Sequence, residues 1–231
     1  KNFDHKGRGN VSMQDVLNQS LNTGMVFVEQ KMGKDLFKEY MLDRYKIGER
    51  TGIDLPNEIK GLVSGLKTPN DVNYATASFG QGIATTPINT VRGFAILANG
   101  GKLVTPHLVR EIKESNGFTK KLEYPVIDNV LKSETTATIR SMLTHVVDDG
   151  YHRGLPHYTV GAKTGTAQIA KSDGTGYYND RNLHSLIGFF PATNPRYVLY
   201  LYNVYPKNGA QFAIQTLGDP FFSMVQFLTN Y

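Results

Sequence analysis

Four consecutive residues in the second half of the chain combine an ammonium, two hydroxyls and a glycine in a way that could serve chemistry. In the stretch VGAKTGTAQ they are Lys163, Thr164, Gly165 and Thr166. If the stretch is a β-strand, Lys163 and Gly165 point to one face and the two threonines to the other. One ligand can meet both sets only by lying along the edge of the strand, as an added strand. An ammonium and two hydroxyls suit a carboxylate, and a side chain at position 165 would hold such a ligand away from the backbone. The alternative is an ordinary edge strand with a solvent-facing lysine.

A second polar group lies about 140 residues earlier, in the sequence SLN, which holds Ser20 and Asn22. Residues two apart do not share a helix face. The two side chains can therefore enter one site only if the helix breaks between them, and the apolar pattern predicts a break there. The alternative is helix capping, for which serine and asparagine are common.

Other chemistries are disfavoured by what the sequence contains. A phosphate-binding loop needs a glycine directly before the lysine, but Ala162 separates Gly161 from Lys163. His152 and His157 lack metal-ligand spacing, and no HExxH is present. The chain has no cysteine, which excludes disulfides and thiolate metal sites. No metal site is predicted.

The composition is that of a globular protein. The 231 residues are 40% hydrophobic and 19% charged, and no apolar run approaches a membrane span. The net charge is +5, but lysine and arginine are scattered along the chain. We therefore expect a generally basic surface and no nucleic-acid partner.

The pattern of apolar residues predicts a helical part over about 1–100 and an antiparallel sheet covered by helices over about 101–231. Ser12 and Asp15 form a predicted capping box, and Thr86 with Pro87 is a predicted helix start. Helices are expected over about 12–20, 23–33, 35–45, 86–99, 133–150 and from Asp219 and Pro220 onward. Strands are expected over 103–112, 120–126, 158–168, 183–190 and 197–205, and the region to about Gly65 is expected to be loop-like.

Taken together, these motifs resemble a known family. SLN is followed by ASFGQG, TTPINTVRGFAILANGG, KTGT and LIGFFPATNPRYVLYL, in the order of the transpeptidase domain of class B (monofunctional) penicillin-binding proteins. TGIDLPNEIKG is similar to the class B stretch between the first two, and the resemblance runs from about Asn10 to Tyr205. It implies an α+β fold of the penicillin-binding-protein and β-lactamase type, with a helical lobe over 1–100 and a sheet lobe with a C-terminal helix over 101–231. The two lobes would form one functional domain.

One departure from the family pattern matters. The family's nucleophile is the serine of an S-x-x-K motif that precedes the Ser-x-Asn motif. The only S-x-x-K here is SGLK, Ser64 to Lys67, which follows it and lies in the loop-like region. We therefore expect the nucleophile and the first sheet strands to lie in an N-terminal part that this chain lacks, and the chain alone to be inactive.

The resemblance implies a serine-type D-Ala-D-Ala transpeptidase that cross-links peptidoglycan stem peptides and is acylated by β-lactams, without a metal or cofactor. Ser20 would be a proton relay to the leaving nitrogen, and Asn22 would orient the nucleophile's lysine. Lys163 would supply positive charge, Thr164 and Thr166 would hold the substrate carboxylate, and Gly165 would let the substrate approach. The N–H of Thr166 would be one oxyanion-hole donor.

The resemblance also implies partners and a location. The partners would be stem peptides, β-lactam antibiotics, the missing N-terminal segment and other cell-wall synthesis proteins. The protein would lie at the extracytoplasmic face of the bacterial cell membrane, through an anchor outside this chain. The alternatives are a non-catalytic β-lactam sensor or scaffold and a β-lactamase, the latter disfavoured by TGIDLPNEIKG and GQGIATTPINT.

Overall fold

A computed structural model describes residues 1–207 and 209–230 of the chain. Its centre is a three-stranded antiparallel sheet of β5 (Gly161–Ala170), β6 (Tyr177–Phe190) and β7 (Tyr197–Val204), in the order β5-β6-β7. Lys163 pairs with Ile187, and Ile187 pairs with Tyr200. The last three of the five predicted strands, over 158–168, 183–190 and 197–205, are confirmed. In this sheet β5 is an edge strand.

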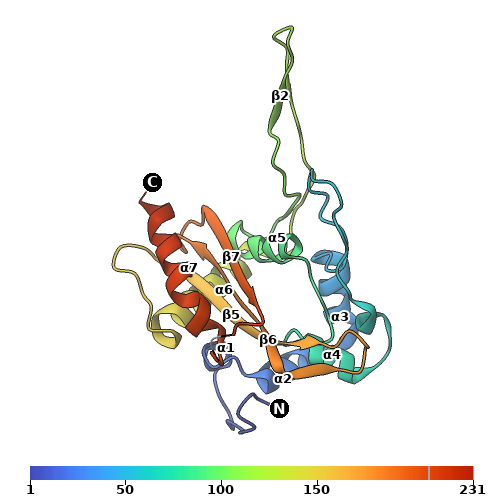
Figure 1. Cartoon of the computed structure of the whole chain (residues 1–231), viewed down its shortest axis with the longest axis vertical. Coiled ribbons are helices and arrows are strands. Elements are labelled where there is room, and N and C mark those ends of the chain that lie inside the picture. The colour runs from blue at the N-terminus through green and yellow to red at the C-terminus, as the bar shows by residue number, and fades with distance from the viewer. Residues whose placement is uncertain (208, 231) are drawn as a thin grey trace.

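Helices cover both faces of this sheet (Figure 1). On one face, α7 (Ala213–Thr229) packs Phe221 and Val225 against Ala162 and Leu186. On the other face, α5 (Pro87–Ala98) and α6 (Ser133–His145) pack around Phe189. Leu186 and Phe189 are fully buried, because β6 is the central strand and both of its faces are covered. The predicted α+β architecture is therefore confirmed.

The C-terminal helix begins earlier than predicted. Asp219 and Pro220 were expected to start it, but α7 begins at Ala213 and contains Pro220 in its interior. An interior proline removes one helix hydrogen bond and costs about 3 kcal/mol. Burial of Leu217, Phe221 and Phe222 on the sheet offsets this cost, since each buried apolar side chain contributes about 1.5–3 kcal/mol.

The helices predicted over about 12–45 are present, and two further helical segments, over 64–67 and 71–77, were not predicted. They are α1 (Met13–Asn18), α2 (Asn22–Met32), α3 (Lys34–Lys38) with a π-helical turn Glu39–Arg44, a 3₁₀ turn Ser64–Lys67, and α4 (Asp71–Ala77). The capping box of Ser12 and Asp15 is present, and Thr86 caps α5. The helix over 133–150 is α6 followed by a π-helical turn, Val146–Gly150.

A projecting arm replaces the two strands predicted over 103–112 and 120–126 (Figure 1). It contains four short strands, and two ladders form from them: β1 (Leu103–Val104) with β4 (Val126–Ile127), and β2 (Glu111–Lys113) with β3 (Thr119–Lys121). Pro106 and Pro125 lack the N–H that a continuous ladder needs, so the pairing is interrupted near both. Asp54 anchors the arm by accepting from the N–H groups of Leu108 and Val109, both at 2.8 Å.

Candidate active site

The SLN motif forms a sharp turn between α1 and α2. Ser20 has a positive φ of 51°, which breaks the helix between Ser20 and Asn22 as predicted. A non-glycine residue in this left-handed region costs on the order of 1–3 kcal/mol, and such strain is commonly found at functional sites. The capping alternative is wrong, because the cap positions are Gln19 and Leu21, and the Ser20 hydroxyl instead contacts Lys163 Nζ.

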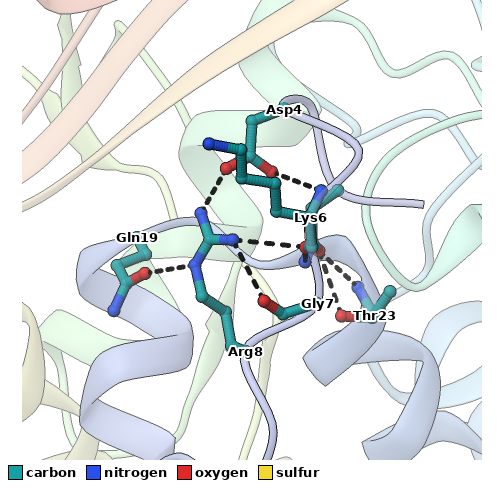
Figure 2. Close-up of polar contacts among 7 residues, drawn as sticks. Asp4, Lys6, Gly7, Arg8, Gln19 and Thr23 are labelled. Atoms are coloured by element: carbon teal, nitrogen blue, oxygen red, sulfur yellow. Dashed lines mark hydrogen bonds and ion pairs between the residues drawn. The ribbon is translucent and has the colours of Figure 1, made fainter.

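The N-terminal segment holds this turn from outside (Figure 2). The Arg8 guanidinium lies between the Asp4 carboxylate, at 2.5 Å, and the Gln19 side chain, at 3.0 Å. It also donates to the carbonyls of Lys6 and Gly7. Since Gln19 directly precedes Ser20, this network fixes the backbone on which Ser20 is carried.

The start of α2 is held by a second contact from the same segment. Buried Asn2 accepts from the Thr23 N–H at 3.1 Å and from the Thr23 hydroxyl at 3.0 Å. Asn2 thus caps α2 from a distant position in the sequence, and the Asn22 amide donates to the Lys1 carbonyl at 3.3 Å. The Asn22 side chain is therefore not used to cap its own helix.

On the sheet side, Lys163 is a half-buried cation without a carboxylate partner among the described residues. Its Nζ contacts the Ser20 hydroxyl and donates to the Thr164 carbonyl at 3.1 Å. Burial lowers the pKa of Lys163 to about 8. A buried charge without a counter-ion is costly, and an anionic ligand would supply the missing partner.

Tyr151 organises Thr164 of β5 and was missed in the sequence. Its hydroxyl accepts from the Thr164 N–H at 2.7 Å and lies 3.0 Å from Thr164 Oγ1. The backbone groups of Thr164 therefore face away from β6. Because this direction alternates along an antiparallel ladder, the N–H and C=O of Thr166 face the same open edge.

The hydroxyls of both threonines can still donate to a ligand. Thr166 Oγ1 accepts from the Ala213 N–H at 3.1 Å, which leaves its own hydrogen available. Tyr151 can donate its hydrogen to Thr164 Oγ1, which leaves the Thr164 hydrogen available in the same way.

Gly165 has a packing role that the sequence did not indicate. A Cβ at this position would come within 2.6 Å of Ser185 Oγ, on the paired residue of β6. Its absence therefore makes room for Ser185 on the Lys163 face of the strand. Clearance for a ligand, the reason predicted from the sequence, remains a prediction.

All six candidate residues line one pocket of about 710 Å³: Ser20, Asn22, Lys163, Thr164, Gly165 and Thr166. Tyr151 lines it too, as do Ser78 and Phe79 of the ASFGQG stretch. At its wall the rings of Phe3 and Phe212 meet edge to face at 5.4 Å. Ser64 and Lys67 are exposed and do not line this pocket, in agreement with the interpretation that SGLK is unrelated to the site.

Apart from Tyr151, the sequence reasoning missed Arg8, Asn2, Phe3 and Phe212. Each acts through a contact between segments far apart in the chain, which no local pattern reveals. Ser78 and Phe79 could have been found, because ASFGQG was already among the motifs of the resemblance.

The fold and the site define a transpeptidase-type domain, with a pocket between a helical turn and the edge of a sheet. The chain matches the family model "Penicillin binding protein transpeptidase domain" over residues 1–222, and it belongs to that family. The predicted family and fold are thereby confirmed.

Individual relatives agree with this assignment. Stage V sporulation protein D of Bacillus subtilis (strain 168) is 37% identical over 210 residues, covering 89% of this chain and 32% of the relative. Peptidoglycan D,D-transpeptidase MrdA of Acinetobacter baumannii is 29% identical over 219 residues, covering 84% of this chain and 32% of the relative. The chain thus spans about a third of the length of these curated relatives.

Solved structures of related proteins share the fold. Penicillin-binding protein 3 of Mycobacterium tuberculosis, complexed with aztreonam, has a TM-score of 0.78 and 29% identity, with coverage of 84% of this chain and 45% of that chain. Penicillin-binding protein 2X of Streptococcus thermophilus also has a TM-score of 0.78, at 26% identity, with coverage of 87% and 31%. Within the described residues, no helix combines the length and apolar character needed to cross a membrane.

Proposed function

We propose that this chain forms the carboxylate-binding and proton-relay part of a serine D,D-transpeptidase that cross-links peptidoglycan stem peptides. The observation that carries the proposal is Lys163, a half-buried cation without a carboxylate partner in the described chain, which shares one pocket with two threonine hydroxyls and Ser20. The peptidoglycan D,D-transpeptidases among the relatives support the reaction class.

The chain's residues have distinct roles in this reaction. The Thr164 and Thr166 hydroxyls and the Lys163 ammonium bind the terminal carboxylate of the stem peptide through charge-assisted hydrogen bonds. The N–H of Thr166, which faces the open edge, donates to the carbonyl oxygen of the scissile bond as negative charge develops there. One such donor contributes about 3 kcal/mol in related acyl transfer. Asn22 donates to the substrate amide and orients the lysine beside the nucleophile.

The reaction has two covalent steps, acylation of the nucleophile and transfer of the acyl group to an amine. A serine Oγ bonds to the carbonyl carbon of the penultimate D-alanine while the C–N bond to the last D-alanine breaks, and Ser20 passes the serine's proton to the leaving nitrogen. An amine of a neighbouring stem peptide then attacks the ester, loses a proton and restores the serine hydroxyl. The contact of Ser20 with Lys163 supports the relay, because the ammonium stabilises the partly charged hydroxyl during transfer.

The nucleophile in this proposal lies outside residues 1–231. The serines that line the pocket are Ser20 and Ser78, and the Ser78 hydroxyl donates to the Ala75 carbonyl at 2.7 Å. We call these 231 residues, joined to the segment that carries the S-x-x-K serine, the whole protein. We further propose that it works at the extracytoplasmic face of the bacterial membrane with other cell-wall synthesis proteins.

Labelling with a penicillin tests the proposal. We expect the whole protein to form a covalent adduct on a serine outside residues 1–231, and the 231-residue chain alone to form none. Ser20→Ala should slow acylation of the whole protein, whereas Ser64→Ala should leave it near wild type. A label mapped by mass spectrometry to Ser20, Ser64 or Ser78 would overturn the assignment. Release of D-alanine and incorporation of an acceptor amine would separate a transpeptidase from a sensor.

A further inference from the structure

Along the outer edge of β5, the backbone groups of Thr164 and Thr166 differ in whether they already have hydrogen-bond partners. At Thr164 both backbone groups are occupied: the N–H donates to the Tyr151 hydroxyl at 2.7 Å, and the carbonyl accepts from Lys163 Nζ at 3.1 Å. At Thr166, two residues further along the same edge, neither backbone group has a partner within the described chain. A ligand strand can therefore pair with β5 at Thr166 but not at Thr164.

Tyr151 is held firmly at the point where the edge closes. It follows the π-helical turn Val146–Gly150, and its N–H donates to the Val146 carbonyl at 2.9 Å. Its ring packs against both apolar clusters, the one around Phe221 and the one around Phe189. Burial raises the pKa of the Tyr151 hydroxyl, so the group that meets the edge stays neutral.

We propose that Tyr151 is a specificity-determining residue that makes the pocket accept only a peptide that ends at Thr164. This inference rests on the proposed function. A ligand strand that pairs at Thr166 and runs toward Thr164 meets the Tyr151 side chain, so it has to stop there. Lys163 selects which terminus stops, because its ammonium attracts a terminal carboxylate and repels a terminal amine.

The ring and the hydroxyl of Tyr151 have different roles in this proposal. The ring is a wall that excludes any residue beyond the terminal one. The hydroxyl orients Thr164, because its bonds to the Thr164 N–H and Oγ1 fix the direction in which the threonine can donate. Removing the hydroxyl should therefore weaken carboxylate recognition, and removing the ring should admit longer peptides.

The test uses the whole protein and two stem peptides that differ only by one glycine added after the terminal D-alanine. We measure cleavage of the D-Ala-D-Ala bond in each by mass spectrometry. Wild type should cleave the peptide with the free terminal D-alanine and reject the extended one. In Tyr151→Ala the ratio of extended to unextended cleavage should rise by about tenfold or more. Tyr158→Ala, whose hydroxyl instead contacts Asn230, is the matched control and should keep the wild-type ratio.

Two more variants keep the test decisive. Tyr151→Leu retains apolar packing but shortens the side chain, so it should raise the ratio even if Tyr151→Ala fails to fold. Tyr151→Phe keeps the wall, so it should still reject the extended peptide while losing about tenfold in its preference for a terminal carboxylate over a carboxamide.

The outcomes distinguish the two proposals. If wild type cleaves the unextended peptide but folded Tyr151→Ala or Tyr151→Leu still rejects the extended one, the inference about Tyr151 is wrong and the proposed function stands. If wild type cleaves neither peptide, the proposed function itself fails.

Discussion

The two walls of the pocket are held in place by different kinds of interaction. The helical wall, with Ser20 and Asn22, depends on polar contacts from the N-terminal segment, chiefly those of Arg8 and Asn2. The sheet wall, Lys163 to Thr166, belongs to a strand whose pairing to β6 is unbroken from Gly161 to Gln168, and Ala162 next to it is fully buried against α7.

This difference has a consequence for stability and for function. Core contacts contribute most of the free energy of folding, whereas partly exposed ion pairs contribute about 0–1 kcal/mol each. Damage to the apolar core behind the sheet wall should therefore unfold the domain, while damage to the N-terminal contacts should misplace Ser20 in a domain that stays folded. The chemistry needs both walls, so activity and stability should respond differently on the two sides.

The largest effect should come from the charge on the sheet wall. Lys163→Ala in the whole protein should slow penicillin acylation by about 10²-fold or more, because the only cation predicted to face the substrate carboxylate is lost. The free energy of unfolding should not fall, since Lys163 has no ion pair to lose and its buried charge is itself costly. Lys67→Ala, in the exposed SGLK turn, is the matched control. Near-normal acylation by a folded Lys163→Ala protein would remove Lys163 from the mechanism.

A smaller effect should separate the two explanations for Gly165. Gly165→Ala places a Cβ 2.6 Å from Ser185 Oγ, and such overpacking typically costs about 1–3 kcal/mol. Adding Ser185→Gly should restore thermal stability. If clearance for the ligand is the main reason for the glycine, acylation by the stable double variant will remain slow. Full recovery of acylation would instead assign Gly165 to cross-strand packing alone.

On the helical wall, Arg8→Ala should slow acylation about tenfold, because Gln19 loses its partner and the Ser20 turn can shift. Unfolding by denaturant should show a loss of only about 1 kcal/mol. Arg44→Ala breaks a partly exposed ion pair with Glu39 that lies outside the pocket, and it should leave acylation unchanged. A large loss of stability with Arg8→Ala would show that the N-terminal segment belongs to the core and would end the contrast between the walls.

The sequence predicted those parts of the site whose physics is local. Ser20 and Asn22 had to be separated by a helix break, and alternation along β5 placed Lys163 and Thr164 on opposite faces. Tyr151 and Arg8 could not be found in this way, because their hydrogen bonds join segments 11 or 13 residues apart that come together only in the folded chain. The start of α7 was misplaced at Pro220 for the converse reason: a local rule about proline was overridden by burial against the sheet.

The smallest expected effect is a pH dependence of acylation that arises from Lys163 on the sheet wall. The pKa of Lys163 is lowered from its ordinary 10.5 to about 8, so the residue is charged below pH 8 and loses its proton above it. Acylation that depends on the ammonium should therefore fall about fourfold between pH 7 and pH 8.5. Between pH 8 and 10.5 the unfolded chain binds more protons at this lysine than the folded chain does, so the contribution of Lys163 to stability should rise while acylation falls. Lys163→Arg keeps its charge throughout this range and should not show the decline. A decline of equal size in Lys163→Arg would assign the titration to another group, such as the nucleophile's own lysine.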